Sequence, residues 1–179
     1  MRFVEDIFPI HYPAAQVLAE ALGVKSAPLA VSVLDLAAGS AVWSVAIAQQ
    51  SLHVRVTAVD WPGVIPVTKK AAARYGLADR YTFIAADLHL ANFGRGHAIA
   101  VLGHILHSEG EARSRRLLSK TLEALAPGGT IAIAEILADA QRRTAAPSVD
   151  LRCEYAGESH EGDTFTFEEI SRLASRDRI

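Results

Sequence analysis

The chain has 179 residues, half of them apolar, and a formal net charge of −2. This length fits one domain with a sizeable core and leaves no room for two full domains. The near-neutral charge and the lack of a polybasic face exclude nucleic acid as an expected partner. The basic cluster 113–116 lies in a helical pattern beside two glutamates, so we interpret it as a solvated helix face.

The cysteine content and the apolar segments indicate in which cellular compartment the chain is expected. A single cysteine, Cys153, cannot form an internal disulfide, which favours the reducing cytoplasm. The first nine residues contain acids where a secretory signal has its apolar segment. The window 27–48 is long and apolar, but Asp35 at its centre would cost about 2.5–3.5 kcal/mol in a membrane helix. We therefore expect a cytoplasmic chain without a membrane span.

Hydrophobic periodicity predicts helices and strands in alternation. The first helix is expected over 11–24, with Pro13 near its start and an apolar face of Val17, Leu18 and Leu22. A capping box at 166–169 predicts the start of a last helix. The expected strands are 31–37, 53–60, 81–87, 98–106 and 130–136. Further helices are expected from Trp43 and over 64–77 and 111–125. A turn is expected at 127–129, and a polar loop over 138–162 that includes a short element at 148–155.

The predicted strands are apolar on both faces, which is typical of a parallel sheet covered by helices on both sides. The sequence thus predicts a single α/β domain over 1–179, with a Rossmann-like, doubly wound parallel sheet in the strand order 3-2-1-4-5.

Three acids mark the ends of consecutive strands: Asp35, Asp60 and Asp87. Ligands of open parallel sheets bind at these carboxyl ends. Gly39 stands alone where a dinucleotide site would have G-x-G-x-x-G, and a carboxylate there would oppose a pyrophosphate. A cofactor with a ribose and a cation but no phosphate fits better, and S-adenosylmethionine is such a molecule. Asp60 would accept hydrogen bonds from both ribose hydroxyls, and Asp87 would approach the adenine.

Three segments carry a family resemblance. "VLDLAAGSAVWS", 33–44, resembles the first motif of class I S-adenosylmethionine-dependent methyltransferases. The segment 58–87, with Asp-x-Pro-x-Val-Ile after the second strand, resembles small-molecule O-methyltransferases. The segment 102–135 is similar to their fourth strand, catalytic-histidine loop and fifth strand. The resemblance covers most of 3–135 and resumes at 161–170.

The resemblance implies a role for each matching residue. In that family the histidine after strand four is the general base, here His107, and Glu135 orients it. A histidine with a pKa of about 6.5 can take the proton of a phenol with a pKa of about 10 during methyl transfer. His104 lies three residues before His107, but without a clear third ligand we expect no metal. The implied cofactor contacts are Asp35, Ala37 and Gly39 at the methionine end, Asp60 at the ribose, Trp61, Asp87 and Leu88 around the adenine, and Gly103 and His104 in the wall.

The sequence also departs from the family pattern. Ala37 and Ala41 stand where the family has glycine, and a positive φ at either site would cost roughly 1 kcal/mol. Family members carry an N-terminal helical dimerisation domain and two further strands, so this sequence looks shortened at both ends. We expect the sheet to be incomplete at its C-terminal edge and the chain to form a homodimer through exposed surface.

The expected activity is methyl transfer from S-adenosylmethionine to a hydroxyl of a small, aromatic molecule. A truncated, catalytically silent cofactor-binding module is one rival hypothesis, favoured by Ala37, Ala41 and Ser108, which replaces the acid usual after the catalytic histidine. A nicotinamide-dependent reductase is another, which the missing glycine pattern disfavours.

Overall fold

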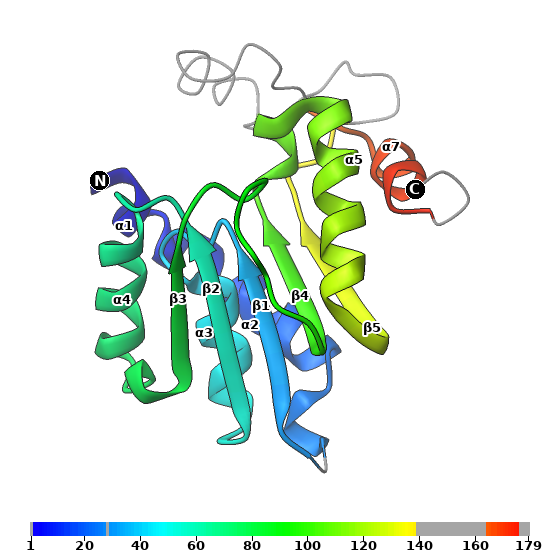
Figure 1. Ribbon diagram of the computed structural model, residues 1–179. Helices are drawn as coiled ribbons and strands as arrows, with labels where there is room; N and C mark the ends of the chain where they lie inside the picture. The colour runs from blue at the N-terminus through cyan, green and yellow to red at the C-terminus, as the bar shows by residue number, and fades with distance from the viewer. Residues whose placement is uncertain (1, 28, 139–163, 176–179) are drawn as a thin grey trace. The chain divides into compact units, whose positions relative to one another are not determined.

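The computed structural model describes residues 2–27, 29–138 and 164–175 (Figure 1). Cys153 and the element expected at 148–155 lie outside the described residues. The chain divides into two compact units, one of residues 1–103 and 124–132 and the other of 104–123 and 133–179. The elements are α1 Arg2–Asp6, α2 Phe8–Ala21, η1 Val24–Ser26, β1 Val31–Leu36, α3 Val42–Gln50, β2 Val54–Asp60, α4 Ile65–Arg74, η2 Ala78–Arg80, β3 Tyr81–Ala85, β4 His97–Gly103, α5 Leu106–Ala124, β5 Leu125–Ala134 and α7 Phe167–Ala174.

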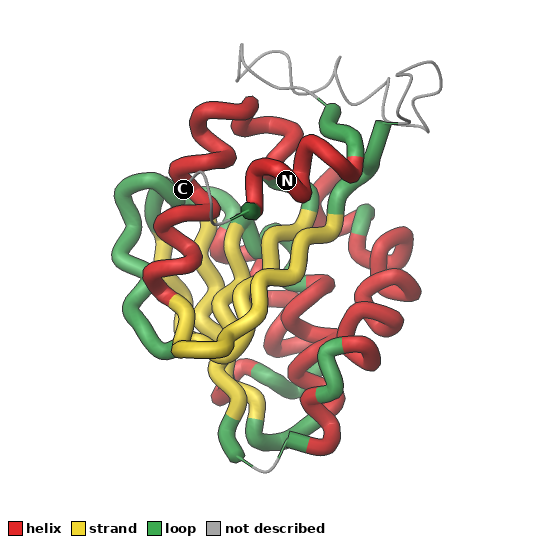
Figure 2. Tube along the Cα trace, turned by 90° about the vertical axis from the view of Figure 1, so that its right-hand side faces the viewer, coloured by secondary structure: helices red, strands yellow, loops and turns green. Residues whose placement is uncertain are grey.

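A five-stranded sheet with the order β3-β2-β1-β4-β5 organises the first unit, as the sequence predicts. The pairs β1–β2, β1–β4 and β2–β3 are parallel. Val33, Leu34 and Leu36 are fully buried on both faces of β1, because helices cover a parallel sheet. In Figure 1, α3 lies behind β1 and β2, and Figure 2 shows the twist of the strands in yellow. The strand order places the ends of β1 and β2 side by side.

Two expected boundaries are wrong. The fourth strand ends at Gly103, and Leu106 already opens α5, so His104 lies in the link between strand and helix. The turn expected at 127–129 lies within β5, where Gly128 adopts a φ of 78°. A Cβ on Gly129 would lie 3.0 Å from the carbonyl oxygen of His97, so glycine lets two backbones approach closely there.

The first helix also differs from expectation. It begins at Phe8 with Pro9 in its first turn, so Pro13 lies inside the helix. Ala15 and Ala19 form its buried face, whereas Val17 is 68% exposed. Small alanines let α2 pack closely against α3, and the expected apolar face of Val17, Leu18 and Leu22 stays exposed or only partly buried.

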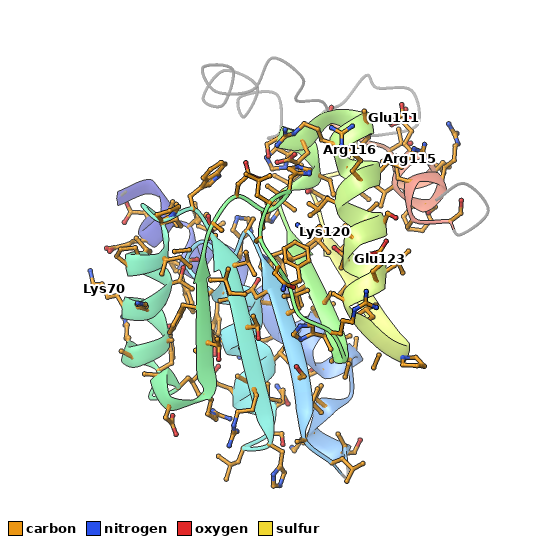
Figure 3. All side chains as sticks on the ribbon, in the orientation of Figure 1. Lys70, Glu111, Arg115, Arg116, Lys120 and Glu123 are labelled. Atoms are coloured by element: carbon orange, nitrogen blue, oxygen red, sulfur yellow. The ribbon has the colours of Figure 1, made fainter. Side chains whose placement is uncertain are left out.

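The basic cluster 113–116 lies on α5, where Arg116 is exposed and Arg113 and Arg115 are partly buried, so the expected solvated face is confirmed only in part. Arg115 donates to Glu111 at 3.0 Å, one helical turn earlier, and Arg113 donates to Glu109 at 2.6 Å across Gly110, whose φ of 66° and ψ of 173° kink the helix. Figure 3 labels Glu111, Arg115 and Arg116 on this helix. The last helix, α7, begins with the expected capping box of Thr166 and Glu169. Among the described residues, no helix is both long and apolar enough to cross a bilayer.

Candidate active site

The turn after β1, residues 35–41, is named here the cofactor turn. Ala37, Gly39 and Ala41 all adopt a positive φ, of 55°, 52° and 58°. L-residues with a Cβ disfavour this left-handed region by roughly 1–2 kcal/mol. The two alanines therefore hold a strained conformation that glycine would adopt without cost, as the sequence comparison with the family anticipates.

Asp60, at the end of β2, fixes the cofactor turn from the neighbouring strand. Its Oδ2 accepts a hydrogen bond from the Gly39 N–H at 2.7 Å, and its Oδ1 accepts one from the Trp61 N–H at 2.7 Å. Thr68 of α4 donates to the Gly39 carbonyl at 2.8 Å. Burial raises the pKa of Asp60, and the two backbone N–H groups oppose that shift. Each carboxylate oxygen keeps a further lone pair for a ligand hydroxyl.

Asp35 is 1% exposed and lies at the inner side of the same turn. Its Oδ2 accepts a hydrogen bond from Ser44 of α3, and Tyr81 of β3 donates to the Ser44 hydroxyl at 3.0 Å. Its Oδ1 is buried with no hydrogen-bond partner among the described residues. Burial, with a smaller contribution from the charge of Asp60, raises the pKa of Asp35 to about 7 against the Ser44 hydrogen bond. Sequence reasoning missed Ser44 and Tyr81.

The remaining expected cofactor contacts of the first unit are Gly103, Trp61, Leu88 and Asp87, and their surroundings differ. A Cβ on Gly103 would lie 2.1 Å from Nε1 of Trp43, so the indole fills the space that any side chain would need. Trp61 is 55% exposed, and Leu88 is buried. The Asp87 carboxylate accepts from the backbone N–H of His89 at 2.7 Å, which closes a local turn.

Three side chains of the second unit form a compact group, named here the histidine cluster: His104, His107 and Glu135. The Glu135 side chain is 2% exposed, and its Oε2 lies 2.9 Å from Nδ1 of His107 and 3.9 Å from Nδ1 of His104. Its Oε1 accepts from the backbone N–H of Leu106 at 2.7 Å. The pairing of His107 with Glu135 is the geometry that a general base and its orienting acid require.

Backbone contacts hold this cluster in place. His104 adopts a φ of 55°, and its N–H donates to the Ala134 carbonyl at 2.8 Å, next to Glu135. The Ser114 hydroxyl donates to the Leu106 carbonyl at 3.2 Å. The left-handed turn at His104 therefore ends the strand and begins α5, and it directs the chain so that His107 follows within one turn.

The donor set of the first unit fits the expected cofactor. Asp60 offers lone pairs to hydroxyls, and Asp35 lies beneath the turn with its Oδ1 free of a hydrogen-bond partner among the described residues. Such carboxylates suit a cationic group with a ribose and would repel a pyrophosphate. Asp35, Gly39 and Asp60 come together as the strand-end argument predicts.

Comparison with known proteins identifies the family. A profile of the O-methyltransferase domain matches residues 17–177. The 3-hydroxy-5-methyl-1-naphthoate 3-O-methyltransferase of Streptomyces sahachiroi is 32% identical over 107 residues, 60% of this chain and 31% of that enzyme. The L-tyrosine C(3)-methyltransferase of Streptomyces lavendulae is 34% identical over 100 residues, 56% of this chain and 27% of that enzyme.

Solved structures agree with this assignment. The crystal structure of a putative O-methyltransferase from Nostoc punctiforme matches with a TM-score of 0.87 and 26% identity, over 96% of this chain and 51% of that one. This chain thus spans about half the length of that structure, and its matches cover about a third of the curated relatives. Because the profile covers nearly all of its residues, the chain belongs to the O-methyltransferase domain family.

Proposed function

We propose that this chain transfers a methyl group from S-adenosylmethionine to a hydroxyl of a small aromatic molecule. The observation that carries this proposal is the 2.9 Å pairing of His107 Nδ1 with Glu135 Oε2. A carboxylate only accepts hydrogen bonds, so Nδ1 carries the proton and Nε2 is the basic nitrogen. Glu135 thereby selects the tautomer that can accept the substrate proton.

The cofactor turn supports the binding half of the proposal. Asp60 would accept hydrogen bonds from the ribose hydroxyls while still holding Gly39 and Trp61. The turn at Asp35, Ala37 and Gly39 would hold the methionine end. Trp61, Asp87 and Leu88 would border the adenine, and Gly103 and His104 would form the wall.

The proposed reaction is a single displacement with general-base assistance. When bound, S-adenosylmethionine supplies a methyl group on a cationic sulfur. The substrate hydroxyl gives its proton to Nε2 of His107 as its oxygen forms the new bond to the methyl carbon. The electron pair of the carbon–sulfur bond would remain on sulfur, so the methyl donor would leave as a neutral thioether. The Glu135 carboxylate stabilises the imidazolium formed on His107.

The relatives support an aromatic acceptor. The name of the Streptomyces sahachiroi enzyme specifies a ring hydroxyl of a naphthoate as its target. The name of the Streptomyces lavendulae enzyme specifies carbon 3 of tyrosine, the ring carbon beside the hydroxyl. Removal of a phenolic proton puts negative charge on the oxygen and on that neighbouring carbon. The same base therefore supports methylation at carbon as a second candidate, and the acceptor's geometry decides between them.

Calorimetry and a transfer assay test the proposal together. We expect S-adenosylhomocysteine to bind the whole chain and NAD not to bind. With methyl-labelled S-adenosylmethionine and a panel of phenolic acceptors, we expect labelled methyl ether or ring-methylated product, which NMR distinguishes. Binding without transfer would support the silent-module hypothesis. Binding of NAD alone would support the reductase hypothesis, and binding of neither would reject the cofactor assignment.

We also propose that the chain acts as a cytoplasmic homodimer. Its single cysteine supports the reducing compartment. The exposed side chains of Ile10 and Val17 on α2 offer apolar surface, and β5 is the edge of the sheet in the described residues. Light scattering over a dilution series should give twice the chain mass at high concentration, and a monomer throughout would contradict it.

A further inference from the structure

The histidine cluster has a second chemical capacity besides proton transfer. His104, His107 and Glu135 each offer one ligand atom, and these three atoms lie within 4.8 Å of one another. Two imidazole nitrogens and one carboxylate oxygen are the ligand types that zinc prefers. All three residues belong to the same compact unit.

Two of the three distances between ligand atoms are close to those of a zinc site, and the third pair lies within 4.8 Å. With zinc–nitrogen and zinc–oxygen bonds of about 2.0–2.2 Å in a tetrahedral site, two ligand atoms lie about 3.4 Å apart. Nδ1 of His107 and Nδ1 of His104 lie 2.9 Å and 3.9 Å from Oε2 of Glu135. Each distance needs to change by only about half an ångström, which small side-chain rotations supply.

The surroundings of the cluster restrain its ligands as a metal site requires. The second oxygen of Glu135 is held by the backbone N–H of Leu106 at 2.7 Å. The backbone N–H of His104 is held by Ala134. The cluster is partly open, since the side chains of His104 and His107 are 21% and 15% exposed, so an ion can enter. Such supporting contacts orient ligands and strengthen metal binding.

We propose that the histidine cluster binds Zn²⁺, and that the bound ion switches off the general base. Zinc binds the lone pair of an imidazole nitrogen, so coordination through Nδ1 of His107 moves the ring proton to Nε2. The nitrogen that accepts the substrate proton then carries a proton itself. Zinc also takes Oε2 of Glu135 away from His107. The inhibitory effect rests on the proposed function, whereas the zinc site does not.

Binding is tested by titration of Zn²⁺ against a chromophoric chelator. We expect one ion per chain. Glu135→Gln and His104→Asn, the latter a residue that tolerates the positive φ, should each weaken binding at least about tenfold. The matched control is His53→Ala, an exposed histidine of the other unit, which should bind like the wild type. Cys153→Ser should also be unchanged. Wild-type affinity in both cluster variants, or loss in either control, would overturn the site.

A second readout reports the tautomer directly. In protein with ¹⁵N-labelled histidine, we expect the ring proton of His107 to move from Nδ1 to Nε2 when Zn²⁺ is added. An unchanged tautomer at full occupancy would overturn the switch. If the chain transfers methyl groups, Zn²⁺ should inhibit at the occupancy set by the titration, and a chelator should restore activity. An inactive chain that binds zinc would reject the proposed function and leave the zinc site standing.

Discussion

Asp60 and Glu135 are both almost buried carboxylates at the ends of strands, yet they prepare different chemistry. Asp60 holds two backbone N–H groups, those of Gly39 and Trp61, and so fixes the shape of a turn. Glu135 accepts from one backbone N–H and pairs with the imidazole of His107, the residue that we propose as the general base. The two carboxylates thus differ in their second partner, a backbone N–H for Asp60 and an imidazole for Glu135, and the proposed roles in binding and in proton transfer follow from that difference.

The largest expected effect comes from substitution of Glu135 or of His107, with which it pairs. His107→Ala and Glu135→Gln should each reduce kcat of methyl transfer about 10²–10⁴-fold, since each removes general-base assistance. The double variant should lose little more, because the two residues act as one unit. Steady-state kinetics with His53→Ala as the control checks this. A fully additive loss would show that the two residues act separately.

Gly103→Ala should be the most destabilising change in the cofactor region. The new Cβ would meet the Trp43 indole at 2.1 Å, and such overpacking costs roughly 1–3 kcal/mol or more. The comparison variant is Gly23→Ala, where the backbone φ of 65° strains a side chain but the space around it is open, unlike at Gly103. Chemical denaturation should give Gly103→Ala a much lower free energy of unfolding than Gly23→Ala. Equal stability of the two would mean that the indole moves aside at no cost.

Asp35 should make stability depend on pH. Its folded pKa of about 7 lies above the ordinary value of 3.8, so the folded state holds the proton more tightly. The free energy of unfolding should therefore fall as pH rises from about 4 to about 7, on the order of a few kcal/mol. Asp35→Asn removes this dependence. Denaturation of both proteins at several pH values measures the difference, and parallel curves would refute the assignment.

Asp60→Ala should show whether Asp60 binds the cofactor or only holds the shape of the cofactor turn. It removes the acceptor of the ribose hydroxyls and of two backbone N–H groups, so binding of S-adenosylhomocysteine should weaken by about 1–3 kcal/mol. Calorimetry gives the affinity, and denaturation shows how much stability is lost with it. Unchanged affinity in a folded variant would leave Asp60 as a turn residue only.

The smallest expected effect is a gain in stability. Ala37→Gly should raise the free energy of unfolding by up to about 1 kcal/mol, because glycine adopts the φ of 55° without strain. Ala38→Gly, next to it with an ordinary backbone, should instead lower stability. Denaturant titrations of the pair give the two signs. A loss in both variants would mean that the Ala37 methyl group packs usefully.

The strand order and the cofactor turn could be predicted because they depend on local signals: valine-rich runs, one glycine and acids at strand ends. Ser44 and Tyr81 could not, since only the folded sheet brings Tyr81 of β3 to the Ser44 hydroxyl. The turn expected at 127–129 was wrong because β5 continues through these residues: Gly128 adopts a φ of 78° within the strand, and Gly129 lets the backbone approach the His97 carbonyl closely. Only the family resemblance places Glu135 beside His107 in advance, because the two residues are 28 positions apart in the sequence and the fold brings them together.

One measurement tests most directly whether the cofactor turn serves binding and the histidine cluster serves proton transfer. Calorimetry with S-adenosylhomocysteine and the methyl-transfer assay are run on the wild type, Asp60→Ala and His107→Ala. We predict that His107→Ala binds within about twofold of the wild type while its transfer falls at least about 100-fold. Asp60→Ala should bind S-adenosylhomocysteine more weakly than the wild type. Wild-type protein that neither binds S-adenosylhomocysteine nor transfers a methyl group, or His107→Ala with undiminished transfer, would contradict the account.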